Sequence, residues 1–157
     1  MALHQGRCRA RGDLQVGVAQ QFGATHVLNS GREDVAQKIR ELTDGQGVDT
    51  AIEAVGVPAT FELCEKLVAP GGVIANVGVH GTKVDLHLED LWSRNVTITT
   101  RLVDTVTTPM LLKTVQSGRL QPAKLITHRF GLGEILQAYE TFGHAADSHA
   151  LKVVIEA

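Results

Sequence analysis

Short apolar segments alternate with amphipathic segments from Val18 to the last residue of the chain, and glycine-containing loops separate them. Short apolar runs predict β-strands, whereas apolar residues that repeat every three or four positions predict helices. Strands that alternate with helices through short loops predict an α/β fold, here an incomplete doubly wound parallel sheet with helices on both faces. The predicted strands are residues 25–28, 49–55, 73–77, 96–100, 126–130 and 151–156.

The predicted helices have recognisable ends. The first helix ends near Phe22, where Gly23 serves as its C-cap. Ser30 to Glu33 form a predicted capping box for a second helix. Proline is favoured in the first turn of a helix, so Pro58 and Pro109 mark two further starts. Residues 134–142 form an amphipathic segment.

The composition excludes several classes of protein. A formal net charge of -2 gives no field for nucleic acid or an anionic membrane, and no apolar run is long enough to span a bilayer. The cluster of Arg7, Arg9 and Arg11 is read as a solvated tail rather than a phosphate site. Two cysteines, Cys8 and Cys64, indicate no disulfide framework, so we expect a cytoplasmic protein without a secretion signal.

Ligands of parallel α/β sheets bind beyond the carboxyl ends of the strands. Here those ends are residues 53–56, 77–80 and 100–103. Gly56 and Gly78 would let a flat ligand approach the backbone, but tight turns alone would also explain them. Glu53 either contacts that ligand or caps the following helix. The residues by themselves leave both alternatives open.

No cluster of side chains predicts a metal site or a nucleophile. His144 and His149 are five residues apart, which does not place two imidazoles on one helical face. We expect all seven histidines to lie on the surface. Cys64 falls on the apolar face of a helix and is predicted to be a core residue. We therefore assign no catalytic and no metal-binding residue.

Several segments together resemble zinc-containing medium-chain alcohol dehydrogenases. The similarity extends over residues 18–157 and matches the C-terminal part of the Rossmann domain plus the C-terminal return segment, as in a truncated member. It divides the chain into an unassigned tail (1–17), a partial Rossmann-like cofactor domain (18–120) and a return segment (121–157). The segments that carry it are 18–25, 47–49, 51–56, 69–72, 76–79, 99–104 and 151–157.

The resemblance implies an oxidoreductase that uses NAD or NADP. It implies that backbone after three successive strands contacts the nicotinamide ribose or carboxamide. Lys152 lies where the family offers a cation to a cofactor phosphate, although a plain surface lysine explains it as well. The implied nicotinamide contacts are Val55, Gly56, Val77, Gly78, Val79, Leu102 and Val103.

Two features of the family are absent from these 157 residues. They contain neither the Cys, His and acidic ligands of the catalytic zinc domain nor the G-x-G-x-x-G loop that grips the pyrophosphate. Gly45-Gln-Gly47 lies between a helix and a strand, which is the wrong context for that loop. We therefore expect weak cofactor binding and no activity of the chain alone.

Without the family's first two strands, residues 49–55 lack a neighbour on one side. Either the strand at 25–28 moves across to pair with them, or another chain fills the gap. We therefore expect a homo-oligomer. The alternatives are an active alcohol dehydrogenase completed by a complementing chain, and a non-catalytic interaction protein.

Overall fold

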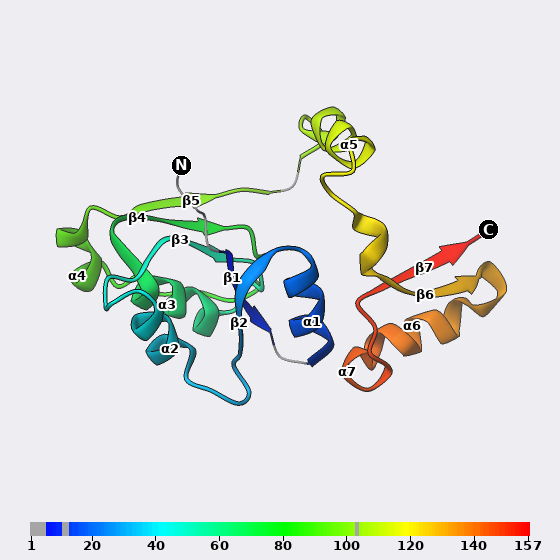
Figure 1. Ribbon diagram of the computed structural model, residues 1–157, viewed down its shortest axis with the longest axis horizontal. Helices are drawn as coiled ribbons and strands as arrows, with labels where there is room; N and C mark the ends of the chain where they lie inside the picture. The colour runs from blue at the N-terminus through cyan, green and yellow to red at the C-terminus, as the bar shows by residue number, and fades with distance from the viewer. Residues whose placement is uncertain (1–5, 11–12, 103) are drawn as a thin grey trace. The chain divides into compact units, whose positions relative to one another are not determined.

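The computed structural model describes residues 6–10, 13–102 and 104–157, with side chains described from residue 17 onward. The chain divides into two compact units. Unit 1 combines the residues up to Arg32 with Thr105–Ala157, and unit 2 is Glu33–Asp104 (Figure 1).

Unit 2 is built on a parallel three-stranded sheet in the order β3 (Val48–Glu53), β4 (Val68–Asn76) and β5 (Thr97–Thr100). The pairing places Glu53 beside Asn76, and Asn76 beside Thr100. The three strands therefore end at the same level, and the loops that follow them start from one edge of the sheet. The helices of this unit are α2 (Val35–Leu42), α3 (Pro58–Leu67), α4 (Leu88–Leu91) and the short η1 (Trp92–Arg94).

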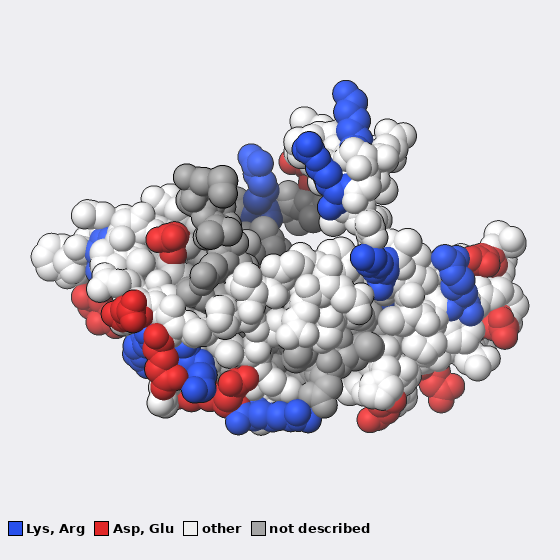
Figure 2. Space-filling view, viewed as in Figure 1, with Lys and Arg blue, Asp and Glu red and all other residues white. Residues whose placement is uncertain are grey.

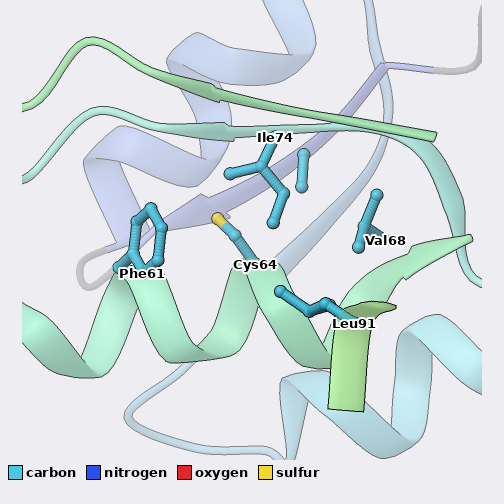
Figure 3. Packing of buried hydrophobic residues seen from close by; sticks show 6 residues of the cluster. Phe61, Cys64, Val68, Ile74 and Leu91 are labelled. Carbon is cyan, nitrogen blue, oxygen red and sulfur yellow. The ribbon is translucent and has the colours of Figure 1, made fainter. Parts of the chain in front are cut away.

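The core of unit 2 lies between α3 and one face of this sheet. Figure 3 shows Phe61 and Cys64 pointing from α3 toward Ile74 of β4, which is completely buried. Ala51, Val68 and Leu91 complete the cluster. The prediction that Cys64 is a core residue is confirmed.

Local sequence explains the ends of α3 and α2. Pro58 occupies the first turn of α3, as predicted, because its missing N–H costs nothing there. The capping box predicted at residues 30–33 is wrong. Asp34 is the N-cap of α2, and its carboxylate accepts a hydrogen bond from the N–H of Gln37 at 3.0 Å.

The strand β4 starts earlier than its sequence predicts. It begins at Val68, directly after α3, whereas the apolar run predicts a start at Val73. Pro70 and the two glycines after it lie within this strand, where the pairing of β3 with β4 shifts in register. Glycine and proline weaken the strand signal in the sequence, but pairing with β3 overrides it.

In unit 1, β1 (Gly6–Ala10) pairs in parallel with β2 (Ala24–Asn29), and α1 (Asp13–Gln21) connects them. The segment predicted to be an unassigned tail, 1–17, therefore contains a strand and the first turn of a helix. The side chains of the predicted arginine cluster and of Cys8 lie outside the described residues, as do residues 1–5, 11 and 12.

The second part of unit 1 contains a parallel two-stranded sheet of β6 (Ile126–Gly131) and β7 (Lys152–Glu156). The helix α6 (Ile135–Gly143) contacts both strands and buries Ala138. The other helical elements are α5 (Thr108–Gln116), η2 (Pro122–Leu125), η3 (Leu132–Glu134) and α7 (Ala145–Ser148).

All strand pairs in the described ranges are parallel, which confirms the predicted α/β class. The doubly wound arrangement stays a prediction, because α3 covers one face of the unit 2 sheet while Ile52 on the other face is exposed. Within the described residues, β2 pairs with β1 and not with β3.

On the face drawn in Figure 2, basic and acidic side chains are interspersed, and most of the surface is neither. No helix in the described parts of the chain combines the length and the apolar character needed to cross a membrane.

Candidate functional site

Glu53 connects the loops that follow β3 and β4. It is the last residue of β3, and its side chain is completely buried. Its main-chain carbonyl accepts hydrogen bonds from the N–H groups of Val77 (2.8 Å) and Gly78 (3.1 Å) in the loop after β4. Its carboxylate turns back and accepts from the N–H groups of Val55 and Gly56, each at 2.9 Å. One residue therefore fixes both loops.

The same carboxylate also reaches the helix α3. The hydroxyl of Thr60, in the first turn, donates to Glu53 Oε1 over 2.6 Å. Burial by itself raises the pKa of a carboxyl group. For Glu53, the hydrogen bonds from Thr60, Gly56 and Val55, together with the charge of His80 when protonated, outweigh burial and lower the pKa. Glu53 is consequently a buried anion that needs these donors.

His80, in the loop after β4, contacts both Asn76 and Glu53. Its Nε2 lies 2.8 Å from Oδ1 of Asn76 and 3.3 Å from Oε2 of Glu53. Because Asn76 uses its amide nitrogen to donate to the Gly78 carbonyl at 3.1 Å, both neighbours of Nε2 are acceptors. Nε2 is therefore the nitrogen that carries a proton. The Nδ1 atom is buried and has no partner among the described residues.

The expectation that every histidine lies on the surface is wrong for His80. The side chain of His80 is largely buried, and its ring meets Phe61 edge to face. His87 is half-buried, and its Nδ1 lies 2.9 Å from Oε2 of the buried Glu65. Sequence spacing could not reveal the contact between His87 and Glu65, because these residues are 22 positions apart and only the tertiary structure brings them together.

The predicted glycines are needed for contact between the loops. Gly56 has a φ of +86°, which favours glycine, and a Cβ there would collide with the carbonyl of Val79. A Cβ on Gly78 would collide with the buried carboxylate of Glu53. The two turns are therefore packed against each other so closely that only glycine fits, and this supports the tight-turn alternative without excluding a ligand.

Apolar side chains surround these glycines at the surface. Val55 is 66% exposed, Val79 77% and Leu102 77%, although each lies two or three residues after the end of a strand of a packed sheet. The main-chain carbonyls of Val55, Val77 and Val79 accept no hydrogen bond from a described residue. The edge of the sheet at these strand ends thus offers apolar surface with hydrogen-bond acceptors beside it. Four N–H groups of the loops are not available to a ligand, because they already donate to Glu53.

The structure brings together five of the predicted nicotinamide contacts, which are Val55, Gly56, Val77, Gly78 and Val79. Leu102 follows β5, whose end is joined to β4 by a hydrogen bond from Arg101 N–H to the Asn76 carbonyl at 3.1 Å. Val103 lies outside the described residues. Lys152 is on β7 in unit 1, so its predicted role toward a phosphate stays a prediction.

A metal site is not formed by the described side chains. No group of three or more His, Cys, Asp or Glu residues within 6–10, 13–102 and 104–157 could hold a metal ion. Glu53 and His80 form a pair, but their remaining neighbours are an amide, a hydroxyl and backbone N–H groups. This set stabilises a carboxylate rather than a cation.

Parallel sheets with loops at aligned strand ends are typical of nucleotide-binding α/β proteins. Comparison with known proteins agrees with this class. The family model described as "Zinc-binding dehydrogenase" matches residues 10–117. The chain belongs to this family.

Individual relatives cover the chain almost completely. An alcohol dehydrogenase of Cupriavidus necator is 31% identical over 151 residues, which are 92% of this chain and 40% of the relative. Zinc dependent alcohol dehydrogenase 2 from Streptococcus pneumonia superposes with a TM-score of 0.87 and 51% identity, over 95% of this chain and 43% of that one. The chain therefore spans about 40% of the length of the curated relatives it matches.

A further solved structure carries a cofactor. It is a zinc-binding dehydrogenase from Sinorhizobium meliloti bound to NADP, with a TM-score of 0.86 and 24% identity, over 99% of this chain and 46% of that one. At this identity the similarity shows the shared fold alone.

Proposed function

We propose that the loops after β3, β4 and β5 form the nicotinamide side of an NAD(P) site, and that the 157-residue chain alone binds this cofactor weakly and does not oxidise alcohols. Membership of the zinc-binding dehydrogenase family supports a dinucleotide as the ligand class. The NADP bound to the structural neighbour from Sinorhizobium meliloti is consistent with it. The choice between NAD and NADP stays open.

The observation that carries the proposal is the exposed apolar edge at three aligned strand ends. Val55, Val79 and Leu102 offer surface for the flat nicotinamide ring. The carbonyls of Val55 and Val77, which accept no hydrogen bond from a described residue, suit the NH₂ group of its carboxamide, which is a donor. Ligands of parallel α/β sheets bind at this edge. Glu53 holds the two loops in place without using those carbonyls.

We expect weak binding of the cofactor because this edge lacks free N–H donors and a loop for the pyrophosphate. The N–H groups of Val55, Gly56, Val77 and Gly78 already donate to Glu53, so they cannot bind the carboxamide oxygen. The 157 residues contain no G-x-G-x-x-G segment. The pyrophosphate therefore lacks the glycine-rich turn and helix N-terminus that anchor it in such folds.

The zinc that the family implies has no fitting set of ligands in the described part of the chain. We therefore assign it no residue and derive no step through it. A bound nicotinamide cofactor supplies hydride transfer, and the residues of this chain would orient its ring.

The cellular location and the assembly are also proposals. We expect the chain to act in the cytoplasm, because it has only two cysteines and one of them, Cys64, is buried in the core of unit 2. We also expect more than one copy in the functional particle.

Calorimetric titration with NAD, NADH and NADPH tests the proposal, on a sample whose oligomeric mass is known. We expect dissociation constants well above about 1 μM and no oxidation of primary or secondary alcohols. Leu102→Ser should weaken the residual binding severalfold. Leu136→Ser on α6 is the matched control, because Leu136 is 82% exposed and lies on a different element.

Two results would contradict the proposal. Dissociation constants at or below about 1 μM would show that the cofactor is held firmly without the pyrophosphate loop. Equal binding by the Leu102→Ser and Leu136→Ser variants would show that the ligand does not lie at the strand ends.

A further inference from the structure

The imidazole of His80 is a titratable group enclosed at the strand ends of unit 2. Its side chain is only 18% exposed, and its ring meets the ring of Phe61 edge to face. Nε2 lies between two acceptors, Oδ1 of Asn76 and Oε2 of Glu53. The proton of the neutral ring is therefore on Nε2, and a second proton has to be placed on Nδ1.

The surroundings of Nδ1 do not suit that second proton. The atom is buried and has no hydrogen-bond partner among the described residues. A buried N–H group without an acceptor costs free energy, and the cost is larger when the group is charged. Protonation of His80 with its ring in this position would therefore create a charged donor that no described residue accepts.

Attraction to Glu53 favours a charged ring that stays in place, but this carboxylate already has other donors. It accepts hydrogen bonds from the N–H groups of Val55 and Gly56 and from the hydroxyl of Thr60. The contact with Nε2 of His80 is longer, at 3.3 Å, and its charge is the smallest of the causes that lower the pKa of Glu53. Glu53 therefore keeps most of its stabilisation when the ring leaves.

The loop after β4 gives the ring access to water. The residues on either side of His80, Val79 and Gly81, are both exposed, and a Cβ at Gly81 would enter open space. In water, both nitrogens of a protonated ring can donate hydrogen bonds. Hydration of the charge thus favours an outward position for the protonated ring, whereas the neutral ring keeps its contacts with Asn76 and Phe61.

One charged group contacts His80 within the described part of the chain. The contacts of its ring come from three elements, with Glu53 on β3, Asn76 on β4 and Phe61 on α3. The acidic residues Glu62 and Glu65 of α3 act on His87. The charged side chains that follow in the same loop and after β5 are exposed, namely Lys83 and Asp85, which pair with each other, and Arg101.

Glu53 keeps its charge throughout the range in which histidine titrates. The pKa of Glu53 is lowered from its ordinary value of 4.5, so the carboxylate stays ionised above about pH 5. Between about pH 8 and about pH 5, His80 is therefore the member of this cluster that changes charge.

We propose that His80 is a pH-sensitive latch on the loop after β4, in which the neutral ring holds the loop closed and protonation at Nδ1 turns the ring outward and frees residues 79–81. Val77 and Gly78 stay bound to the Glu53 carbonyl, so the change is confined to the part of the loop that carries the exposed Val79. This opening does not depend on a cofactor. Its consequence, a lower affinity for NAD(P) in acid, rests on the proposed function.

NMR of the cofactor-free chain tests the latch directly. At about pH 8, the ¹⁵N shifts of His80 should show a neutral ring with its proton on Nε2, and nuclear Overhauser contacts should join this ring to Phe61. At about pH 5, those contacts should be lost, and the amide signals of Gly78 and Val79 should shift with the midpoint of His80. Contacts with Phe61 that persist when Nδ1 is protonated would overturn the proposal, as would a ring that stays neutral down to about pH 5.

Two variants separate His80 from the other histidine of this segment. His87→Gln should leave the pH-dependent shifts of Gly78 and Val79 unchanged. His80→Gln keeps an N–H donor for Asn76 but does not titrate, so these two signals should stay constant between about pH 8 and about pH 5. Continued titration of the signals in the His80→Gln variant would overturn the proposal. If this variant does not fold, the contacts with Phe61 in the original chain decide.

Calorimetric titration with NAD, whose phosphates do not titrate in this range, measures the effect on the proposed cofactor site. The dissociation constant of the original chain should be at least about threefold higher at about pH 5.5 than at about pH 8, and that of the His80→Gln variant should be equal at both. Equal affinity of the original chain at both pH values would overturn the link between the latch and the cofactor. Absence of NAD binding at either pH would contradict the proposed function instead, since the NMR result tests the latch without a ligand.

Discussion

The carboxylate of Glu53 accepts the backbone N–H of Gly56 at 2.9 Å, although both residues belong to a turn that has an exposed apolar surface. The same carboxylate binds the hydroxyl of Thr60, and the main-chain carbonyl of Glu53 binds the loop after β4. A buried anion therefore determines the shape of both loops at the strand ends. The stability and the ligand affinity of unit 2 should both depend on it.

Replacement of Glu53 by Gln should lower the free energy of unfolding by about 1–3 kcal/mol, since the amide can no longer accept all the N–H and O–H donors that the carboxylate accepts. Urea unfolding followed by circular dichroism measures the loss. Glu89→Gln, at an exposed position of α4, removes the same charge and should change stability by less than about 0.5 kcal/mol. Equal stability of the Glu53→Gln variant and the original chain would contradict this role.

Stability should fall in acid because of the same group. The pKa of Glu53 is lowered from its ordinary value of 4.5, so its stabilising contribution is complete above that value and is lost as the pH falls through the folded-state pKa. Unfolding measured from about pH 7 to about pH 3 should show a decline that is shallower in the Glu53→Gln variant. Parallel curves for the two proteins would mean that other carboxylates cause the decline.

Gly78→Ala should destabilise unit 2 by about 1–3 kcal/mol, because the added methyl group meets the buried Glu53 carboxylate and the backbone of Gly56. Gly81→Ala is the control three residues later, where a Cβ would enter open space, and we expect a change below about 0.5 kcal/mol. Thermal unfolding of both variants measures the difference. Similar midpoints for the two variants would show that the loops can move apart freely.

His87 should make stability depend on pH near neutrality. The hydrogen bond to Glu65 raises the pKa of His87 above 6.5, and this contribution outweighs the opposite effect of burial. The contribution is therefore complete below 6.5 and is lost as the pH rises through the folded-state pKa. NMR titration of the His87 ring from about pH 5 to about pH 8 should show the raised midpoint.

The matched variants for this pair are His87→Gln and His149→Gln, the second at an exposed position of unit 1. Stability of the His87→Gln variant should vary less across this pH range than stability of the His149→Gln variant. An unshifted His87 midpoint would show that the contact with Glu65 does not persist in solution.

The order of helices and strands from Val18 onward follows from local patterns, since apolar periodicity, Pro58 and the glycine-containing loops mark most of the element ends. The start of β4 at Val68 does not, because pairing with β3 draws Pro70 and its neighbouring glycines into the strand. Local spacing also misplaces the cap of α2, because Ser30 and Glu33 have the spacing of a capping box, whereas the helix begins only at Val35.

The sequence alone determined the α/β class, the family resemblance and the strand-end positions where a ligand is expected, since these depend on short-range patterns that each segment carries by itself. Only the tertiary structure decided that Glu53 and His80 are buried partners and that Gly56 and Gly78 are needed for contact between two loops. Those relationships join residues from different strands, and their energies arise from burial and hydrogen-bond geometry that exist only once the strands are paired.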